Sequence, residues 1–409
     1  MARPLSHIRV LDLTRVLAGP WASQNLADLG AEVIKIERPG SGDDTRSWGP
    51  PFLKDKEGKD TGESAYFLSV NRGKKSVTLD ISTPEGAKIA RDLAAKSDVL
   101  LENYKVGGLA KYRLGYDDVR ATNPGIVYCS VTGYGQSGPS AHLPGYDFIF
   151  QGMGGLMSIT GERDELPGGG PQKVGIAITD VMAGMYASLA ITAALLHRER
   201  TGKGQYIDMA LLDTIVAFGA NQISNYFHSG KIPVRWGNAH PNLLPYEVFP
   251  TADGHLILGA GNDSQWASLC AAADRPELAS DPRFRTMPDR IRNREALIPL
   301  LQKILRQRTS RDWIARFDAA NVPCGPINNY KEVFENPQVK HRRLKIEQPH
   351  PLSGAIPGVA SPMRFSETPV EYGMPPPLLG QHTREVLSSV LGMSGEELDR
   401  LAALKITSL

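Results

Sequence analysis

A single carboxylate, Asp180, stands where a short apolar stretch gives way to a long run of small and aliphatic residues. That run ends in the basic sequence 197–200, followed by Gly202 and Gly204. We therefore expect a helix over residues 181–196 with Asp180 as its N-cap. The positive end of the helix dipole favours an ionised carboxylate at this position. Such a carboxylate can attack an activated acyl group, or it can simply cap the helix, and the pattern alone leaves both roles open.

The elements that must position Asp180 follow an alternating pattern of strands and helices, which is typical of an α/β fold with a parallel sheet. Strands are expected over residues 8–13, 31–36, 76–79, 99–102, 126–131 and 206–209, and helices over 21–29, 83–97 and 211–227. Arg38, Asn103, Tyr134 and Asp180 all follow the carboxyl ends of such apolar stretches. In a parallel sheet these ends meet at one edge, where ligands bind. We therefore expect a ligand site at that edge.

The composition changes after residue 224, which indicates more than one domain in a chain of 409 residues. Residues 1–224 are expected to form a large α/β domain that carries Asp180, and residues 225–326 a smaller α+β domain. Residues 327–409 are expected to be an extended linker that returns to the large domain and ends in two helices, 383–391 and 394–405.

Charge and cysteine usage exclude some classes of function. A net charge of +2 does not indicate binding to nucleic acid. The apolar run 181–196 is shorter than the ~20 residues that span a bilayer, so a membrane-spanning helix is not expected. Three widely separated cysteines suit a reducing compartment, and no leader peptide is recognised before the first strand, so a cytoplasmic location is expected. Isolated histidines such as His240 and His382 are more often structural than ligands, so no metal is expected.

The first strand–helix turn also bears on nucleotide binding. Glu37 follows the second strand, as an acidic residue does in dinucleotide-binding folds. However, the first turn contains only Gly19 and lacks the three spaced glycines that let a pyrophosphate approach the backbone. NAD is therefore not expected as a cofactor.

Motifs spread over nearly the whole chain resemble one family, the class III CoA-transferases, which include formyl-CoA transferase and carnitine CoA-transferase. In order they are VLDLTRVLAGP, LGAEVIKIERPGSGDDTR, NRGKKSVTLD, LLENYKVGGL, the Asp180 segment with ALLHRERTGKGQ, VPCGPINN and PLLGQHT. Within the family the chain looks most like the succinyl-CoA:glutarate CoA-transferases, through GDDTRSWGPPF, YCSVTGYGQSGP, RWGNAH and PPPLLGQHT.

The resemblance implies a Rossmann-like large domain, a smaller domain and a homodimer whose two chains are interlocked. It implies that Asp180 is the nucleophile, which takes CoA from an acyl-CoA such as succinyl-CoA through an acyl–aspartyl anhydride and an aspartyl-CoA thioester. CoA would then pass to a carboxylate such as glutarate. Backbone N–H groups at the helix start and in the turn of Gly259 and Gly261 would stabilise the oxyanions.

Positions for CoA carry over by the same resemblance, and the phosphates suit Arg38, Lys105 and Lys111 by charge. The full set is Leu17, Ala18, Arg38, Leu79, Asp80, Ile81, Ser82, Asn103, Tyr104, Lys105, Lys111 and the segment Leu143 to Tyr146. Expected substrate residues are Arg46 and Arg235 for a distal carboxylate, together with His240, Gly259 and Gly261. Leu17 stands where formyl-CoA transferases have glutamine, and Lys111 where they have arginine, which disfavours formyl-CoA:oxalate specificity.

Two other interpretations remain at this stage. The α-methylacyl-CoA racemases of the same superfamily carry a histidine at the position before Asp147, where this chain has Tyr146. Tyrosine, with an ordinary pKa near 10, is a poor base at neutral pH. A non-catalytic module that binds acyl-CoA would keep Arg38 but would have no need for Asp180.

Overall fold

The computed structural model describes residues 3–409, which fall into two compact units. Unit 1 contains the described residues up to Leu156, together with Lys173–His228 and Gln338–Leu409. Unit 2 contains Met157–Gln172 and Ser229–Pro337. The chain therefore enters unit 2 twice and returns to unit 1 each time.

The predicted division at residues 224 and 326 differs from these units mainly in the segment Met157–Gln172, which the prediction placed in the large domain. Hydrogen bonds tie this segment to the rest of unit 2. The guanidinium of Arg235 donates to the carbonyl oxygens of Ser158 and Glu162, at 3.2 Å in both cases. Such long-range bonds leave no periodic signal in the sequence.

A six-stranded parallel sheet forms the centre of unit 1, with the strand order β5-β2-β1-β6-β7-β8. The strands are β1 (Arg9–Asp12), β2 (Glu32–Glu37), β5 (Lys74–Thr78), β6 (Val99–Glu102), β7 (Val127–Thr132) and β8 (Gln205–Ala210). Counted along the chain within the sheet, this is the order 3-2-1-4-5-6 of a Rossmann fold. The direction of winding reverses between β1 and β6, so a crevice is expected at their carboxyl ends.

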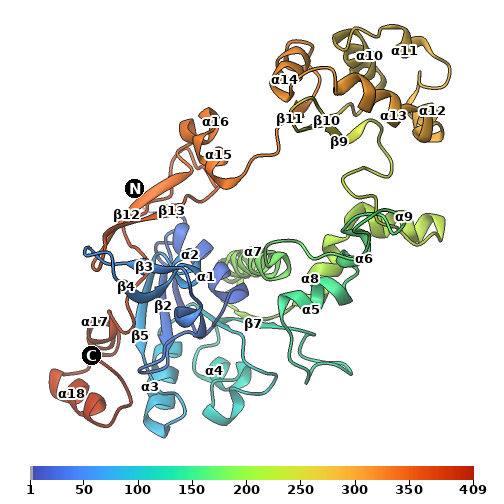
Figure 1. Ribbon diagram of the computed structural model, residues 1–409. Helices are drawn as coiled ribbons and strands as arrows, with labels where there is room; N and C mark the ends of the chain where they lie inside the picture. The colour runs from blue at the N-terminus through green and yellow to red at the C-terminus, as the bar shows by residue number, and fades with distance from the viewer. Residues whose placement is uncertain (1–2) are drawn as a thin grey trace. The chain divides into compact units, whose positions relative to one another are not determined.

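Helices cover both faces of this sheet (Figure 1). One face packs on α1 (Ala18–Asp28), α5 (Asp147–Met153), α7 (Ile178–Thr201) and α8 (Leu211–Phe218). The other packs on α3 (Pro84–Ala95), α4 (Tyr116–Thr122), α17 (Thr383–Leu391) and α18 (Gly395–Ala403). Neighbouring residues of β1 point to opposite cores, Val10 to the first and Leu11 to the second. Strands buried on both faces explain the continuous apolar runs in the sequence.

Shorter elements complete unit 1. They are η1 (Asp44–Ser47), α2 (Ala65–Val70), η2 (Ala110–Tyr112), α9 (Ala220–Ser229), α16 (Pro337–His341) and the hairpins β3 (Phe52–Lys54) with β4 (Asp60–Ser64) and β12 (Lys345–His350) with β13 (Gly354–Val359). The predicted helix 211–227 is wrong as a single element, because it breaks into α8 and α9 at Gly219 and Ala220. Ala220 has a φ of 41°, which no continuous helix tolerates.

Unit 2 combines a small antiparallel sheet with helices around its own apolar core. The strands are β9 (Tyr246–Pro250), β10 (His255–Gly259) and β11 (Cys324–Gly325). The helices are α10 (Asp263–Ala272), α11 (Glu277–Ser280), α12 (Met287–Arg292), α13 (Arg294–Leu305), α14 (Ser310–Ala319) and α15 (Tyr330–Glu335), and α6 (Leu156–Ile159) leads into the unit. The predicted α+β character agrees with this arrangement.

The helix that carries Asp180 is longer than the predicted 181–196, because α7 runs from Ile178 to Thr201. Asp180 therefore lies within its first turn and is not its N-cap, a position that Ala177 occupies. By length and composition alone, α7 could cross a membrane. The prediction that this helix is too short to span a bilayer is therefore wrong. Its buried face, however, belongs to the core that α1 and the sheet share, as in the core helix of a globular unit.

Helix α7 packs closely on α1 (Figure 1), and this contact depends on a glycine of α7. A Cβ atom at Gly184 would lie 2.5 Å from the carbonyl oxygen of Ala18 and 3.0 Å from the Cβ of Trp21. The backbone of α1 cannot yield as a flexible side chain would. Only glycine lets the two helix backbones approach so closely.

We therefore expect Gly184→Val to destabilise unit 1 by ~1–3 kcal/mol, the usual cost of overpacking a core. The measurement is the thermal unfolding midpoint of the full chain. Ala121→Val is the matched control, because it places the same β-branched side chain at an exposed position of α4, a helix outside the contact between α1 and α7. Equal midpoints for the two variants would contradict the close-packing argument.

Candidate active site

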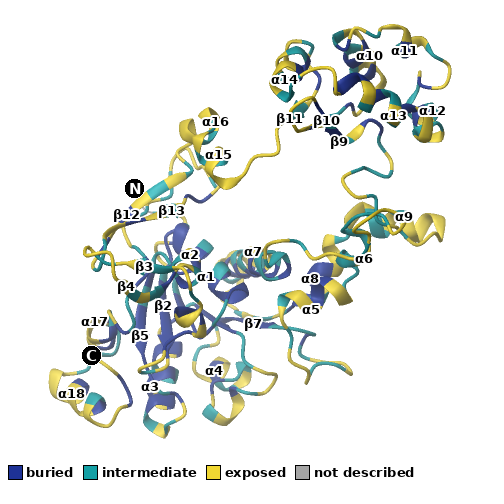
Figure 2. Cartoon of the chain, viewed as in Figure 1, coloured by how far each residue is buried: buried dark blue, intermediate teal, exposed yellow. Residues whose placement is uncertain are grey.

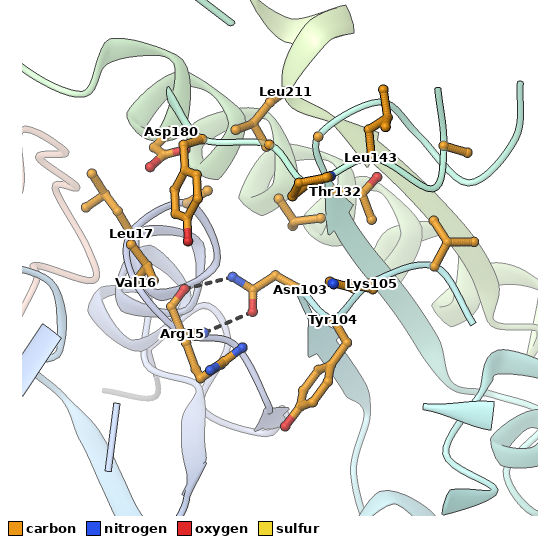
Figure 3. Close-up of a pocket in the computed structure, with 18 of the residues that line it drawn as sticks. Arg15, Val16, Leu17, Asn103, Tyr104, Lys105, Thr132, Leu143, Asp180 and Leu211 are labelled. Atoms are coloured by element: carbon orange, nitrogen blue, oxygen red, sulfur yellow. Dashed lines mark hydrogen bonds between the residues drawn. The ribbon is translucent and has the colours of Figure 1, made fainter. Parts of the chain in front are cut away.

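A cavity of about 290 Å³ opens at the carboxyl ends of β1, β6 and β7, on the crevice that the strand order predicts. Figure 3 shows this cavity and the elements around it. Its lining comes from the turn before α1, the loop after β6, the loop before α5 and the first turn of α7. The predicted residues in it are Leu17, Ala18, Asn103, Tyr104, Lys105, Leu143, Tyr146 and Asp180. Residues far apart in sequence thus meet at one edge of the sheet.

The Asn103 side chain fastens two walls of the cavity together. Its Nδ2 donates to the carbonyl oxygen of Arg15 at 2.7 Å, and its Oδ1 accepts from the Arg15 backbone N–H at 3.0 Å (Figure 3). This pair of bonds joins the loop after β6 to the turn after β1. Asn103 therefore shapes the cavity through the backbone of the neighbouring turn, a role that the sequence did not indicate.

The Asp180 carboxyl group lies half-buried at the rim of this cavity. Burial raises the pKa of Asp180 to about 7, and the negative charge of Asp147 adds to the shift. The phenol of Tyr66 lies in the same electrostatic environment, because burial and the charges of Asp180 and Asp147 raise its pKa to about 12. Asp180 is thus protonated in part at neutral pH and is more basic than an ordinary carboxylate.

Two side chains of α5 hold the segment that leads into α7. Asp147 Oδ1 accepts from the Thr179 backbone N–H, and Asp147 Oδ2 accepts from Gln151 Nε2, both at 2.8 Å. Gln151 Oε1 accepts from the Val174 backbone N–H at 2.8 Å, and its Nε2 also donates to the Ile176 carbonyl oxygen at 3.3 Å. These bonds fix the entry of α7 and thereby the position of Asp180.

A second cavity of about 290 Å³ lies beside the ends of β2 and β5. It collects the predicted residues Arg38, Leu79, Asp80, Ile81, Ser82 and Tyr104. Arg15, Asp44 and Tyr104 line both cavities, and Arg15 Nη1 bonds Asp44 Oδ2 at 2.9 Å. The two cavities are therefore neighbours that share one wall. Together they suit an elongated ligand better than a compact one.

Lys111 lines neither of these two cavities. Its ammonium lies 4.7 Å from the ring centroid of Tyr112, and Tyr112 lines the second cavity. A contact between Lys111 and a ligand there stays a prediction.

Arg46 does not fit the predicted role of binding a distal carboxylate. Its side chain is almost fully buried and bonds both oxygens of Glu37 at 2.8 Å and both oxygens of Glu63 at 3.0 and 2.8 Å. It also donates to the carbonyl oxygen of Pro377 at 3.1 Å. The guanidinium is saturated by protein acceptors, so Arg46 supports the fold of the loop after β2.

The predicted substrate residues of unit 2 also have protein partners. Arg235 pairs with the Asp164 carboxylate in addition to its two carbonyl partners, and its side chain is nearly buried. The ring of His240 packs against Tyr246, with 5.4 Å between ring centroids. Arg235 therefore supports unit 2 and is not a free guanidinium for a distal carboxylate.

The backbone N–H groups of the turn that was predicted to stabilise oxyanions also have hydrogen-bond partners within the protein. The Gly259 backbone N–H donates to the Pro323 carbonyl oxygen at 2.9 Å, and the Gly261 N–H to Gln265 Oε1 at 2.8 Å. The Ala260 N–H between them donates to the Pro245 carbonyl oxygen at 2.9 Å. Oxyanion stabilisation by this turn is therefore not supported by the backbone geometry.

Some residues at the site were missed by sequence reasoning. Arg15, Val16 and Asp44 line the cavities but were not singled out, and neither were Asp147 and Gln151 as supports of α7. A signal existed for the last two, because an acid and an amide four residues apart share one face of a helix. For Arg15, Val16 and Asp44, only the folded turns reveal the position.

Comparison with known proteins agrees with this geometry. The chain is 48% identical to a succinate–glutarate CoA-transferase of Agrobacterium fabrum, over 95% of this chain and 96% of that protein. It is 46% identical to the human succinyl-CoA:glutarate CoA-transferase, over 95% of this chain and 86% of that protein. A crystal structure of a CaiB/BaiF family protein from Brucella suis superimposes with a TM-score of 0.84 at 46% identity, covering 95% of this chain and all of the other. The profile of CoA-transferase family III matches residues 5–383, and this protein belongs to that family and is a CoA-transferase.

Proposed function

We propose that this enzyme moves CoA from succinyl-CoA to glutarate or a closely related dicarboxylate, through covalent intermediates on Asp180. The single observation that carries the chemistry is the placement of Asp180, a basic carboxylate at the rim of a cavity formed by residues expected to bind CoA. The names of the relatives that share 46–48% identity support the choice of donor and acceptor.

In the first half of the reaction an Asp180 oxygen attacks the thioester carbonyl carbon of succinyl-CoA. The carbon–sulfur bond breaks, CoA leaves as a thiolate, and a mixed succinyl–aspartyl anhydride remains. The thiolate then attacks the Asp180 carbonyl carbon. Succinate leaves with the anhydride oxygen, and the enzyme holds CoA as an aspartyl thioester.

The second half reverses these steps with the acceptor. A carboxylate oxygen of glutarate attacks the aspartyl thioester, which releases CoA thiolate and forms a glutaryl–aspartyl anhydride. The thiolate then attacks the glutaryl carbonyl carbon, so that glutaryl-CoA leaves and the Asp180 carboxylate is restored. No net proton is exchanged, because a thioester and a carboxylate are consumed and formed in equal number.

The two neighbouring cavities suit the two ends of a CoA thioester. We place the thioester in the first cavity beside Asp180 and Leu17, and the nucleotide end in the second, where Arg38 supplies a guanidinium for phosphate. Lys105 of the first cavity provides a further cation along the same path. We do not assign recognition of the distal carboxylate to Arg46 or Arg235, because both guanidinium groups donate to acceptors within the protein.

Incubation with succinyl-CoA and glutarate is expected to yield glutaryl-CoA and succinate. Incubation with succinyl-CoA alone should leave a CoA-sized adduct on the protein that hydroxylamine removes, seen by intact-protein mass spectrometry. Asp180→Ala should form no adduct and lose activity by at least ~10³-fold, as enzymes do without their nucleophile.

Asp117→Ala, at an exposed aspartate of α4, is the control and should behave as wild type. Wild-type protein that binds CoA yet gives no adduct with succinyl-CoA or other acyl-CoA thioesters would contradict the covalent route through Asp180. Turnover with other carboxylates but not with glutarate would contradict the assigned acceptor only.

The raised pKa of Asp180 predicts the pH dependence. Only the ionised carboxylate attacks, so kcat/KM for succinyl-CoA should rise with pH along a limb whose midpoint lies near the pKa of about 7. Asp147→Asn removes the neighbouring charge but keeps an oxygen that accepts from the Thr179 N–H, so the limb should move to lower pH. A limb that does not move, or moves to higher pH, would contradict the electrostatic coupling.

We also propose that the enzyme is a homodimer with interlocked chains. The support for a dimer is a set of exposed apolar side chains on helices of unit 1. Figure 2 shows exposed positions of these helices in yellow. The apolar side chains come from α5, α7, α8 and α9, namely Phe148, Ile149, Met153, Met185, Tyr186, Leu189, Leu196, Val216, Phe218, Tyr226 and Phe227. Apolar surface of this extent marks an interaction site, and a second copy of the chain is the occupant proposed here.

Light scattering should give a mass of twice the 44.5 kDa of one chain. If the chains are interlocked, tagged and untagged dimers mixed in native buffer should not exchange subunits, because exchange would require unfolding. Mixing after denaturation and refolding is the positive control and should give hybrid dimers. Exchange within minutes under native conditions would refute the interlocking, and a monomeric mass would refute the dimer.

A further inference from the structure

Four ionisable side chains are buried beneath the turn that leads from β1 into α1. They are Asp12, Lys35, Asp43 and Lys74, each at most 1% exposed. Removing charges from water is costly, and well-packed apolar residues often give equal or greater stability. A set of buried charges around one turn therefore calls for a role beyond packing.

The contacts of Asp12, Lys35 and Asp43 converge on the turn itself. Lys35 Nζ donates to the Thr14 carbonyl oxygen at 2.7 Å and to Asp43 Oδ2 at 2.9 Å. Asp12 Oδ1 accepts from the Thr14 backbone N–H at 2.8 Å and from its hydroxyl at 2.5 Å. Thr14 is thus held on both its carbonyl and amide sides by side chains of β1 and β2.

Asp43 forms hydrogen bonds with the next part of the turn. Its Oδ1 accepts from the Val16 backbone N–H at 3.3 Å and from the Thr45 N–H at 3.0 Å. Burial alone would raise the pKa of Asp43, but Lys35 beside it lowers the pKa to about 2, so the pair is ionised. The ion pair and the Val16 amide therefore share one carboxylate.

Val16 has an unusual backbone for its type. Its φ is 73°, in the left-handed region where a β-branched side chain is a genuine outlier. Such strained residues persist only where the surrounding structure fixes them, and they cluster at functional sites. Val16 lines the first cavity, and so do its neighbours Arg15 and Leu17. The strain therefore lies in the wall of the cavity in which we place the thioester.

We infer that Lys35 and Asp43 act as a clamp that holds Val16 in its left-handed conformation and thereby positions the Arg15–Ala18 wall for the CoA thioester. The inference rests on the proposed binding of acyl-CoA in this cavity. Lys35 and Asp43 are positioning residues, because they act on the ligand through the backbone of the turn.

The test is a double-mutant cycle between the clamp and the strained residue. Lys35→Met removes the charge and keeps a long side chain, whereas Val16→Gly provides a residue that adopts positive φ without strain. With Val16 in place, Lys35→Met should raise KM for succinyl-CoA and Kd for CoA roughly fivefold or more, the size expected from one strained residue. In the Val16→Gly background the same change should raise them less than about twofold, because the turn no longer needs the clamp.

Lys75→Met is the matched control, since Lys75 lies next in β5 to the buried Lys74 but pairs with Glu32 and Glu385. It should leave KM and Kd as in wild type. Asp43→Asn removes the negative charge of the ion pair and can replace Lys35→Met in the same double-mutant cycle. The inference therefore stays testable if Lys35→Met does not fold. An equal rise in both backgrounds, or a lower unfolding midpoint with unchanged KM and Kd, overturns the clamp. Wild-type protein that does not bind CoA overturns the proposed function, and the clamp with it.

Discussion

The close packing of α7 on α1 is the constraint on which the site depends. Gly184 lets the backbone of α7 approach the Ala18 carbonyl, and Ala18 begins the helix that follows the cavity wall. Asp180 lies one helical turn before Gly184, so this contact brings the carboxylate to the rim that Leu17 and Ala18 form. A carboxylate at the start of an isolated helix would be solvated and of ordinary pKa. Its unusual basicity comes from the burial that this packing imposes.

The charges around the cavity are divided between two tasks. Asp147 stands near Asp180 and raises its pKa, while its own oxygens are used to fix the segment that enters α7. On the other side, Lys35 and Asp43 neutralise each other and direct their hydrogen bonds to the backbone of the turn after β1. The basicity of Asp180 thus comes first from burial and is increased by an acid near the cavity, and the shape of the wall is set by paired charges beneath it.

Arg46 and Arg235 show why charge alone does not identify a substrate ligand. Both are arginines near family motifs, and both looked suited to a distal carboxylate. In the folded chain each guanidinium is turned toward carboxylates and carbonyl oxygens of its own unit. An arginine whose donors are already satisfied has little to gain from a ligand. Arg38, in contrast, lines the second cavity.

The sequence by itself determined the α/β class, the strands of the main sheet and the CoA-transferase family, because local periodicity and ordered motifs carry that information. The expectation that parallel strands end together also placed Asn103 and Asp180 at one edge of the sheet, where both line the first cavity. Only the tertiary structure decided that Asp180 lies inside the first turn of α7, that residues 157–172 group with unit 2, and that Arg46 is saturated. The position of Val16 in the left-handed region belongs to the same group. These features depend on contacts between residues far apart in the chain, and such contacts leave no periodic trace in the sequence.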